Sequence, residues 1–219
     1  MNRESPLPPV RIVVVDDHGI VREGLMALLN RQEGMTVIGS AATGKAAIQA
    51  AERLKPDIII MDLMLPDVNG IDATERILSA NPATQIIALS ASHTTEHVCR
   101  ALRAGARGYV VKDARGAELI EAVKTVASGK QYLSQRAQLP PEGLRDGRLG
   151  KTPIERLSTR EREVLHRIVE GSTSVAIAKE LSLSRKTVDT YRARLMVKLG
   201  VSNRTALIRL AIENELLAS

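Results

Sequence analysis

The sequence is poor in the residue types that form disulfides, stack on bases or span membranes. Its one cysteine, Cys99, excludes an internal disulfide and fits a reducing compartment. With no Trp, no Phe and three Tyr, the cores must be built from Val, Ile, Leu and Ala, and stacking on single-stranded bases is disfavoured. No apolar run approaches the roughly 20 residues of a membrane span, and the first residues lack the apolar core of a signal peptide. We therefore expect a cytoplasmic protein that does not enter a membrane.

Charge is divided unevenly along the 219 residues. Residues 1–130 hold 15 Lys and Arg against 15 Asp and Glu, whereas residues 131–219 hold 16 against 10, so the second part carries the whole net charge of +6. The length suits two domains of moderate size. A neutral first part joined to a basic second part indicates that the second part meets a polyanion, most often nucleic acid.

Short β-branched runs alternate with segments of helical period in the first part. Strands are predicted at 11–15, 36–39, 57–61, 85–89 and 108–111, and helices at 19–31, 43–54, 70–80, 94–104 and 115–128. The runs are almost continuously apolar, which is typical of strands covered on both faces. The pattern predicts an α/β fold: a five-stranded, doubly wound parallel sheet of flavodoxin-like type.

Three of these runs end in residues suited to phosphoryl chemistry. IVVVDD closes on Asp16 and Asp17, IIIMD closes on Asp62, and YVVK closes on Lys112. Because the carboxyl ends of parallel strands meet at one crevice, we expect the four side chains to converge there. Clustered carboxylates suit a hard cation such as Mg²⁺, and a cation with a lysine can neutralise a phosphoryl group during transfer.

The second part has an all-helical pattern. Residues 130–155 contain Pro140-Pro141 and three glycines, which indicates a linker, and helices are predicted at about 158–170, 174–181, 185–199 and 203–217. Ser158 with Glu161 forms a capping box at the start of the first helix. The short SLS connection before residue 185 is typical of a helix-turn-helix, and the following helix carries a net charge of +4 over 184–198.

The motifs together resemble a known family. The pair Asp16-Asp17, the segment MDLMLPDVNG around Asp62, Ser90 ending IIALS and GYVVK resemble the receiver domain of a two-component response regulator. The stretches LSTREREVLHRIVEG and IAKELSLSRKTVDTYRARLMVKLGVSNR resemble a LuxR-type helix-turn-helix. The whole is similar to the NarL/FixJ family of transcription factors. This implies a receiver at 1–129, the linker at 130–155 and a DNA-binding domain at 156–219.

The resemblance implies a role for each receiver residue. Asp62 would accept a phosphoryl group from a sensor histidine kinase, so the protein is not an enzyme beyond its own phosphorylation and dephosphorylation. Lys112 would pair with the phosphoryl oxygens, Ser90 would turn toward them, and Tyr109 would move inward behind Ser90 or be ordinary core. Mg²⁺ would be held by Asp16, Asp17, Asp62 and the backbone carbonyl of Met64. A homodimer on phosphorylation, promoter DNA and RNA polymerase are the further partners implied.

The second helix of the helix-turn-helix is predicted to enter the major groove of double-stranded DNA. Its candidate DNA-binding residues are Arg185, Lys186, Asp189, Thr190, Arg192, Ala193, Arg194 and Lys198. Arg185, Arg192 and Lys198 are expected to bind phosphates, and Asp189 and Thr190 are expected to face base edges. Pairing of Asp189 with Arg185 or Arg192 is the alternative.

Other interpretations of the residues stay open at this point. A metal-dependent phosphohydrolase of the haloacid dehalogenase type also phosphorylates an aspartate, but it needs a second Asp where this chain has Met64. A receiver that acts through protein contacts only, with a vestigial effector, is the other alternative, and the intact basic helix argues against it. Asp67 is interpreted as a loop residue, and His97 as part of a solvated helix face. An apolar stripe on the last helix is interpreted as core or as a dimer seam, and the resemblance favours the seam: Ala206, Leu207, Leu210, Ala211 and Leu217.

Overall fold

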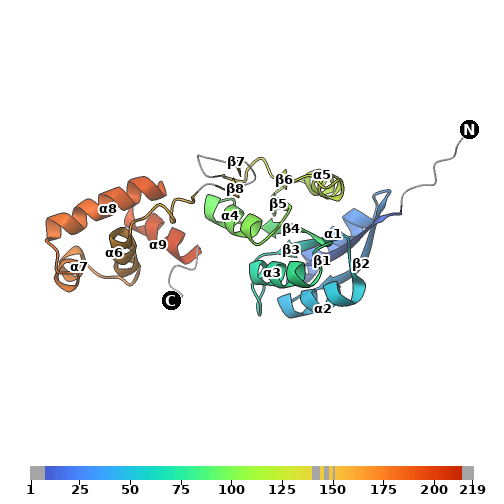
Figure 1. Cartoon of the computed structure of the whole chain (residues 1–219), viewed down its shortest axis with the longest axis horizontal. Coiled ribbons are helices and arrows are strands. Elements are labelled where there is room, and N and C mark those ends of the chain that lie inside the picture. Colours follow the sequence, from blue (N-terminus) through green and yellow to red (C-terminus); the bar gives the residue numbers. More distant parts are fainter. Residues whose placement is uncertain (1–7, 140–143, 146–147, 150, 214–219) are drawn as a thin grey trace, which may run out of the picture. The chain divides into compact units, whose positions relative to one another are not determined.

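The computed structural model describes residues 8–139, 144–145, 148–149 and 151–213 (Figure 1). The chain forms two compact units, Met1–Gln138 and Leu139–Ser219. The first is an α/β unit and the second is built on helices. None of the helices in the described ranges is long and apolar enough to cross a bilayer.

The first unit contains one sheet in the order β2-β1-β3-β4-β5-β6, with every neighbouring pair parallel. The strands are β1 (Val10–Val15), β2 (Met35–Ala41), β3 (Ile58–Asp62), β4 (Gln85–Ser90), β5 (Gly108–Val111) and β6 (Tyr132–Leu133). The helices are α1 (Gly19–Asn30), α2 (Gly44–Leu54), α3 (Gly70–Ala80), α4 (Thr95–Arg103) and α5 (Gly116–Ala127). The expected doubly wound α/β fold is confirmed.

Both faces of the sheet are covered, as the continuous apolar runs predicted. One set of strand residues, including Ile12, Ile60 and Val110, forms a cluster with buried residues of α1 and α5. The alternate strand residues, such as Val13 and Ile59, are also fully buried, on the face where α2, α3 and α4 lie (Figure 1). Since successive strand residues point to opposite faces, a sheet with helices on both sides needs apolar residues at every position.

The expected five-stranded sheet and the expected domain boundary both need correction. A sixth strand, β6, pairs with β5 inside the segment interpreted as linker, and the first unit extends to Gln138 rather than to residue 129. Two further short strands in the linker segment, β7 (Leu144–Arg145) and β8 (Arg148–Leu149), form an antiparallel pair. Residue patterns gave no signal for β6 because a two-residue strand has no periodicity to detect.

The second unit holds α6 (Thr159–Val169), α7 (Ser174–Glu180), α8 (Arg185–Leu199) and α9 (Arg204–Glu213). The capping box is present: the Ser158 hydroxyl accepts from the backbone N–H of Glu161, whose carboxylate accepts from the backbone N–H of Ser158. The hydroxyls of Thr173 and Ser184 accept backbone N–H groups at the starts of α7 and α8. These caps satisfy N–H groups that helix starts otherwise leave unpaired.

Part of the apolar stripe of the last helix serves as core, while Ala206 and Leu210 are partly exposed. Leu207 and Ala211 are fully buried, and Leu207 belongs to the core cluster that also contains Val188, Leu195 and Leu199 of α8. Leu217 lies outside the described residues.

Candidate functional site

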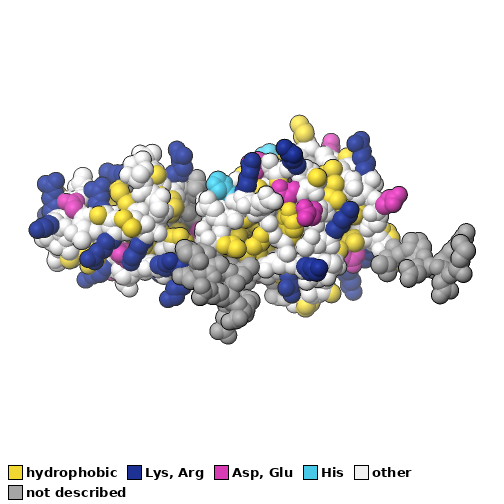
Figure 2. Space-filling model, turned by 90° about the horizontal axis from the view of Figure 1, so that it is seen from above, with side chains coloured by type: hydrophobic (Ala, Val, Ile, Leu, Met, Phe, Trp, Pro, Cys, Tyr) yellow, Lys and Arg dark blue, Asp and Glu magenta, His cyan; other side chains and the backbone are white. Residues whose placement is uncertain are grey.

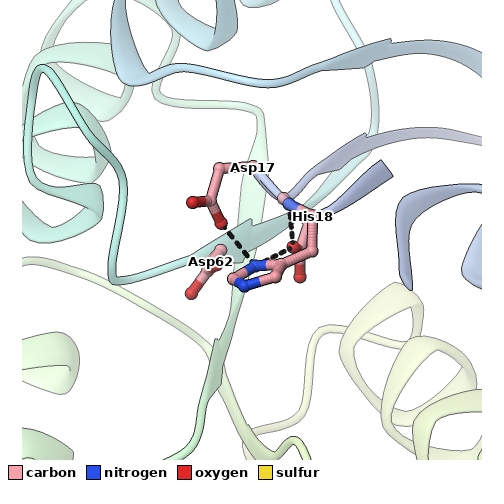
Figure 3. A group of neighbouring side chains, drawn as sticks. Asp17, His18 and Asp62 are labelled. Carbon is pink, nitrogen blue, oxygen red and sulfur yellow. Dashed lines mark hydrogen bonds and ion pairs between the residues drawn. The ribbon is translucent and has the colours of Figure 1, made fainter. Parts of the chain in front are cut away.

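Acidic side chains from the ends of two neighbouring strands converge at one edge of the sheet. Asp16 directly follows β1, and Asp62 is the last residue of β3, which pairs with β1. Both are buried, whereas the side chain of Asp17 is 34% exposed. Figure 3 shows Asp17, His18 and Asp62 pointing toward one another. One ligand atom from each of these three residues and from Asp16 lies within 4.8 Å of the others.

Lys112 joins the acidic cluster from the end of β5. Its Nζ donates a hydrogen bond of 2.7 Å to Oδ2 of Asp62 and lies 2.8 Å from Oδ2 of Asp16. Burial would lower the pKa of Lys112, but the two carboxylates outweigh it and raise this pKa, so the ammonium stays charged. Burial raises the pKa of Asp62, and the hydrogen bonds from Lys112 and from the Met64 backbone oppose that rise. The four side chains expected from the strand ends are therefore neighbours.

The cluster has the donor set of a hard divalent cation. Oδ2 of Asp16 is buried and accepts no well-aligned hydrogen bond from the described residues, although the charged Nζ of Lys112 lies 2.8 Å away. Asp17 reaches the cluster from a partly exposed position, where a cation can enter from solvent. Carboxylate oxygens are the ligands that Mg²⁺ prefers in proteins, so these residues fit such an ion.

The loop after β3 is fixed to the residues around it. The N–H of Met64 donates to Oδ1 of Asp62 at 3.0 Å, which orients the carboxylate. A Cβ at Gly70, the first residue of α3, would lie 2.1 Å from the backbone oxygen of Asp62, so only glycine lets the helix start so close to the strand.

Asp67 holds the same loop from its other side, so its interpretation as an ordinary loop residue was incomplete. Its carboxylate accepts backbone N–H groups of Gly44 at 2.7 Å and Lys45 at 3.1 Å, at the start of α2. Desolvation acts to raise the pKa of Asp67, but backbone N–H donors, including that of Val68, lower it to about 2.

A chain of hydrogen bonds leads from the end of β4 to Tyr109. The hydroxyl of Ser90 accepts the N–H of Ser92 at 3.1 Å, and the hydroxyl of Tyr109 donates to the backbone oxygen of Ser92 at 2.7 Å. Tyr109 is fully buried, and this burial raises its pKa to about 12. His97, expected on a solvated face, is instead 9% exposed, and its Nδ1 lies 3.2 Å from the Ser92 hydroxyl and 3.1 Å from that of Thr94.

The second unit presents a basic surface on α8. Lys and Arg side chains are prominent on the visible face of this unit (Figure 2). A shallow hollow is lined by Arg185, Lys186, Asp189, Thr190 and Ala193. These five residues and Arg194 are exposed, whereas Val188 and Leu195 are fully buried, so α8 turns one face to the core and the other to solvent.

Several candidate DNA-binding residues of α8 have partners within their own unit. Arg185 forms a loose ion pair of 3.8 Å with Asp189, as the alternative interpretation of Asp189 predicts. Arg192 donates to the Ser174 hydroxyl at 2.7 Å, which ties α8 to α7. Lys198 lies 2.7 Å from Oε2 of the buried Glu161.

Sequence patterns did not reveal two residues that contact the acidic cluster. Nδ1 of His18 lies 2.7 Å from Oδ1 of Asp17, and its backbone N–H donates to Oδ1 of Asp16 at 2.9 Å. Arg22 donates to the backbone oxygen of Asp16 at 2.6 Å. The position of His18 immediately after the acidic pair was a usable signal; Arg22, one helical turn later, was a weaker one.

Comparison with known proteins agrees with both units. Residues 12–124 match the family described as "Response regulator receiver domain", and residues 155–211 match "Bacterial regulatory proteins, luxR family". The chain is a response regulator of the NarL/FixJ family. Its architecture is therefore that of a transcription regulator, with a receiver and a LuxR-type DNA-binding domain, and not that of a conventional enzyme.

Similarity to relatives of this response regulator extends over nearly the whole chain. The chain is 35% identical to the response regulator GacA of Pseudomonas viridiflava, over 94% of this chain and 96% of that protein. It is 34% identical to the oxygen regulatory protein NreC of Staphylococcus aureus, over 95% and 99% respectively. A structure of RcsB from Salmonella enterica serovar Typhimurium, bound to a promoter in the presence of phosphomimetic BeF3⁻, matches with a TM-score of 0.72 and 28% identity, over 91% of this chain and 96% of that one.

Proposed function

We propose that Asp62 accepts a phosphoryl group from a sensor histidine kinase and that the phosphorylated protein binds promoter DNA to regulate transcription. The observation that carries this proposal is the convergence of Asp62, Asp16 and Lys112 at the carboxyl edge of the sheet, with Nζ of Lys112 2.7 Å from Asp62. A nucleophilic carboxylate beside an ammonium and further carboxylates suits phosphoryl transfer to aspartate.

The transfer itself is a single displacement at phosphorus. An oxygen of Asp62 forms the new P–O bond while the P–N bond of the kinase phosphohistidine breaks, and the imidazole nitrogen keeps the electron pair. Lys112 neutralises the phosphoryl oxygens, and the Met64 N–H holds the other Asp62 oxygen in place. Asp16, Asp17, Asp62 and the backbone carbonyl of Met64 would hold Mg²⁺, which when bound supplies further neutralisation of the transferred group.

Ser90 and Tyr109 are the switch residues of this proposal. The Ser90 hydroxyl lies at the end of β4, which pairs with the strand that ends in Asp62. On phosphorylation it turns toward the new phosphoryl oxygens and gives up the N–H of Ser92, which changes the loop that Tyr109 contacts.

For the DNA-binding domain, α8 is the helix proposed to enter the major groove. Support comes from its length of 15 residues, its start directly after a tight turn and its exposed basic face. The candidates for contact with DNA phosphates are Arg185, Lys186, Arg192 and Arg194. Lys198, also expected to bind a phosphate, is a weaker candidate because it pairs with Glu161. Asp189, Thr190 and Ala193 line the hollow on the exposed face and are the base-reading candidates. Binding of DNA as a homodimer and contact with RNA polymerase complete the proposal.

The test is phosphoryl uptake by the intact protein. Wild type and Asp62→Asn are incubated with acetyl phosphate and MgCl₂, and intact mass reports the added phosphoryl group. Asp72→Asn, at an exposed carboxylate in the first turn of α3, is the matched control. We expect uptake by wild type and the control and none by Asp62→Asn, because an amide is not a nucleophilic anion. Equal uptake by all three proteins would overturn the assignment of Asp62.

A further inference from the structure

The segment after α5 is folded back onto the receiver as a strap, defined as residues 132–138. Its first part is β6, which pairs with β5 through Tyr132 and Leu133. The N–H of Tyr132 donates to the oxygen of Arg107 at 3.0 Å, and the N–H of Ser134 donates to the oxygen of Tyr109 at 2.8 Å. The strap is thus hydrogen-bonded to the backbone of Tyr109, one of the two proposed switch residues.

The middle of the strap is attached to the elements that follow β5. Ser134 is 3% exposed, and its hydroxyl donates to the carboxylate of Glu118 on α5. Arg136 forms an ion pair with Asp113, the residue next to Lys112, although both side chains are well exposed and the pair is correspondingly weak. These contacts attach the strap to α5 and, more weakly, to the residue that follows Lys112.

The far end of the strap is bonded to the loop after β4. The N–H of Gln138 donates to the backbone oxygen of His93 at 2.9 Å. The neighbouring residue in that loop, Ser92, accepts the Tyr109 hydroxyl with its backbone oxygen and donates its N–H to Ser90. The loop at residues 90–93 is therefore hydrogen-bonded to the Tyr109 hydroxyl and to Gln138, and within the loop Ser92 is bonded to the Ser90 hydroxyl.

We propose that the strap is a release device that reports the state of Ser90 to the chain leading into the DNA-binding domain. The inference rests on the proposed function of Asp62 and Ser90. When the Ser90 hydroxyl turns to the phosphoryl group, the Ser92 N–H loses its acceptor and the loop shifts. The Gln138–His93 bond then breaks and the end of the strap is released, while β6 stays paired. Release lengthens the free chain between the two domains, which alters how they can engage DNA together.

Hydrogen–deuterium exchange of the full-length protein tests the release. Samples with and without acetyl phosphate and MgCl₂ are compared, and intact mass gives the phosphorylated fraction in each. We expect roughly three- to tenfold faster exchange in peptides covering 134–138 after phosphorylation, the effect of losing about one hydrogen bond. Peptides within α5 should be unchanged. Unchanged exchange over 134–138 in a sample that is fully phosphorylated would overturn the inference.

A matched pair of variants isolates the Gln138 N–H. Gln138→Pro removes the donor, whereas Gln138→Ala keeps it and trims only an exposed side chain. In the unphosphorylated state, Gln138→Pro should already show the fast exchange over 134–137 and should not respond further to phosphorylation, while Gln138→Ala should behave like wild type. Ser134→Ala, which removes the contact with Glu118, is a second variant and should also accelerate exchange without phosphorylation. If Gln138→Pro and Ser134→Ala both keep slow exchange and a full response to phosphorylation, these contacts do not hold the strap and the proposed release is wrong.

These outcomes separate the two proposals. Failure of wild type to take up phosphate would remove the proposed role of Asp62. Uptake of phosphate without any change over 134–138 would leave that role intact and remove only the release of the strap.

Discussion

Nζ of Lys198, at the end of α8, lies 2.7 Å from Oε2 of Glu161, in the first turn of α6. Glu161 is 2% exposed, and the same carboxylate accepts the backbone N–H and the hydroxyl of Ser158. One side chain therefore caps α6 and holds the last turn of the proposed recognition helix. Desolvation acts to raise the pKa of Glu161, but its bonds with Lys198 and Ser158 outweigh this and lower the pKa.

Lys198→Ala should destabilise the DNA-binding domain by about 1 to 2 kcal/mol, because a buried carboxylate loses a charged partner that is itself partly exposed. Urea unfolding of the full-length protein measures this loss. DNA binding over a range of salt concentrations should keep its slope, whereas Arg185→Ala should lower the slope by about one unit. Unchanged stability together with a reduced slope would mean that Lys198 serves DNA phosphates instead.

Tyr109 should ionise late in an alkaline titration. Burial raises its pKa to about 12 from the ordinary value of 10.0, so the neutral phenol is favoured in the folded state. Its contribution to stability is therefore complete below pH 10 and is lost as the pH rises toward 12. Phenolate absorbance of wild type and Tyr109→Phe checks this, since the chain has no Trp and three Tyr. If the ionisation at the highest pH is still present in Tyr109→Phe, its assignment to Tyr109 is wrong.

Gly70→Ala should destabilise the receiver by about 2 kcal/mol or more and reduce phosphoryl uptake, because the new Cβ would press on the Asp62 backbone. Gly24→Ala is the control. It adds a methyl group to α1 with no atom within 4 Å, so it should raise stability by about 0.5 to 1 kcal/mol. Denaturant unfolding compares the two variants, and equal effects would show that the close approach at Gly70 can relax.

Asp189→Ala should cost about 1 to 3 kcal/mol on the cognate site and relax preference at one base pair, because a carboxylate can accept a hydrogen bond from cytosine N4. Selection of random duplexes by wild type and the variant measures this. The 3.8 Å pair with Arg185 is long enough to leave Asp189 available for a base. An unchanged consensus with uniformly altered affinity would mean that Asp189 only organises the helix.

Phosphorylation should favour a dimer, through the receiver face near Tyr109 or through the exposed side of α9. The hollow on α9 is lined by Val201, Asn203, Thr205, Ala206, Arg209 and Leu210. Light scattering with and without phosphodonor, across a wide concentration range, should show a larger mass in the phosphorylated sample. Arg209→Glu should abolish this increase if α9 is the seam and leave it intact if the receiver face is used. An identical mass in all wild-type samples would refute the coupling.

The sheet and most of the acidic site could be predicted because their signals are local in sequence. Apolar runs mark strands covered on both faces, and parallel topology brings the strand ends together, so the sequence alone predicts one site for Asp16, Asp62 and Lys112. The same holds for Ser158 and Glu161, whose spacing of three residues defines a capping box.

The remaining features depend on contacts between distant residues. Lys198 meets Glu161 across 37 positions and Asp67 meets Gly44 across 23, and no periodicity encodes either contact. β6 forms only because β5 offers an unpaired edge, and its own two residues carry no strand pattern. His97 has a surface-like sequence context, yet two hydroxyls of its own loop satisfy it in a buried position.

The two attachments of the loop after β3, Asp67 on the start of α2 and Gly70 against the backbone of Asp62, bear on the rate of the proposed transfer. In the proposed transfer, they hold the Asp62 carboxylate in place before a donor arrives, so little conformational freedom remains to be lost. The entropic part of the activation barrier is thereby reduced in advance. On the proposed function, the receiver therefore contributes to its own phosphorylation, and donors other than the kinase that can present phosphorus in line with that oxygen should also react.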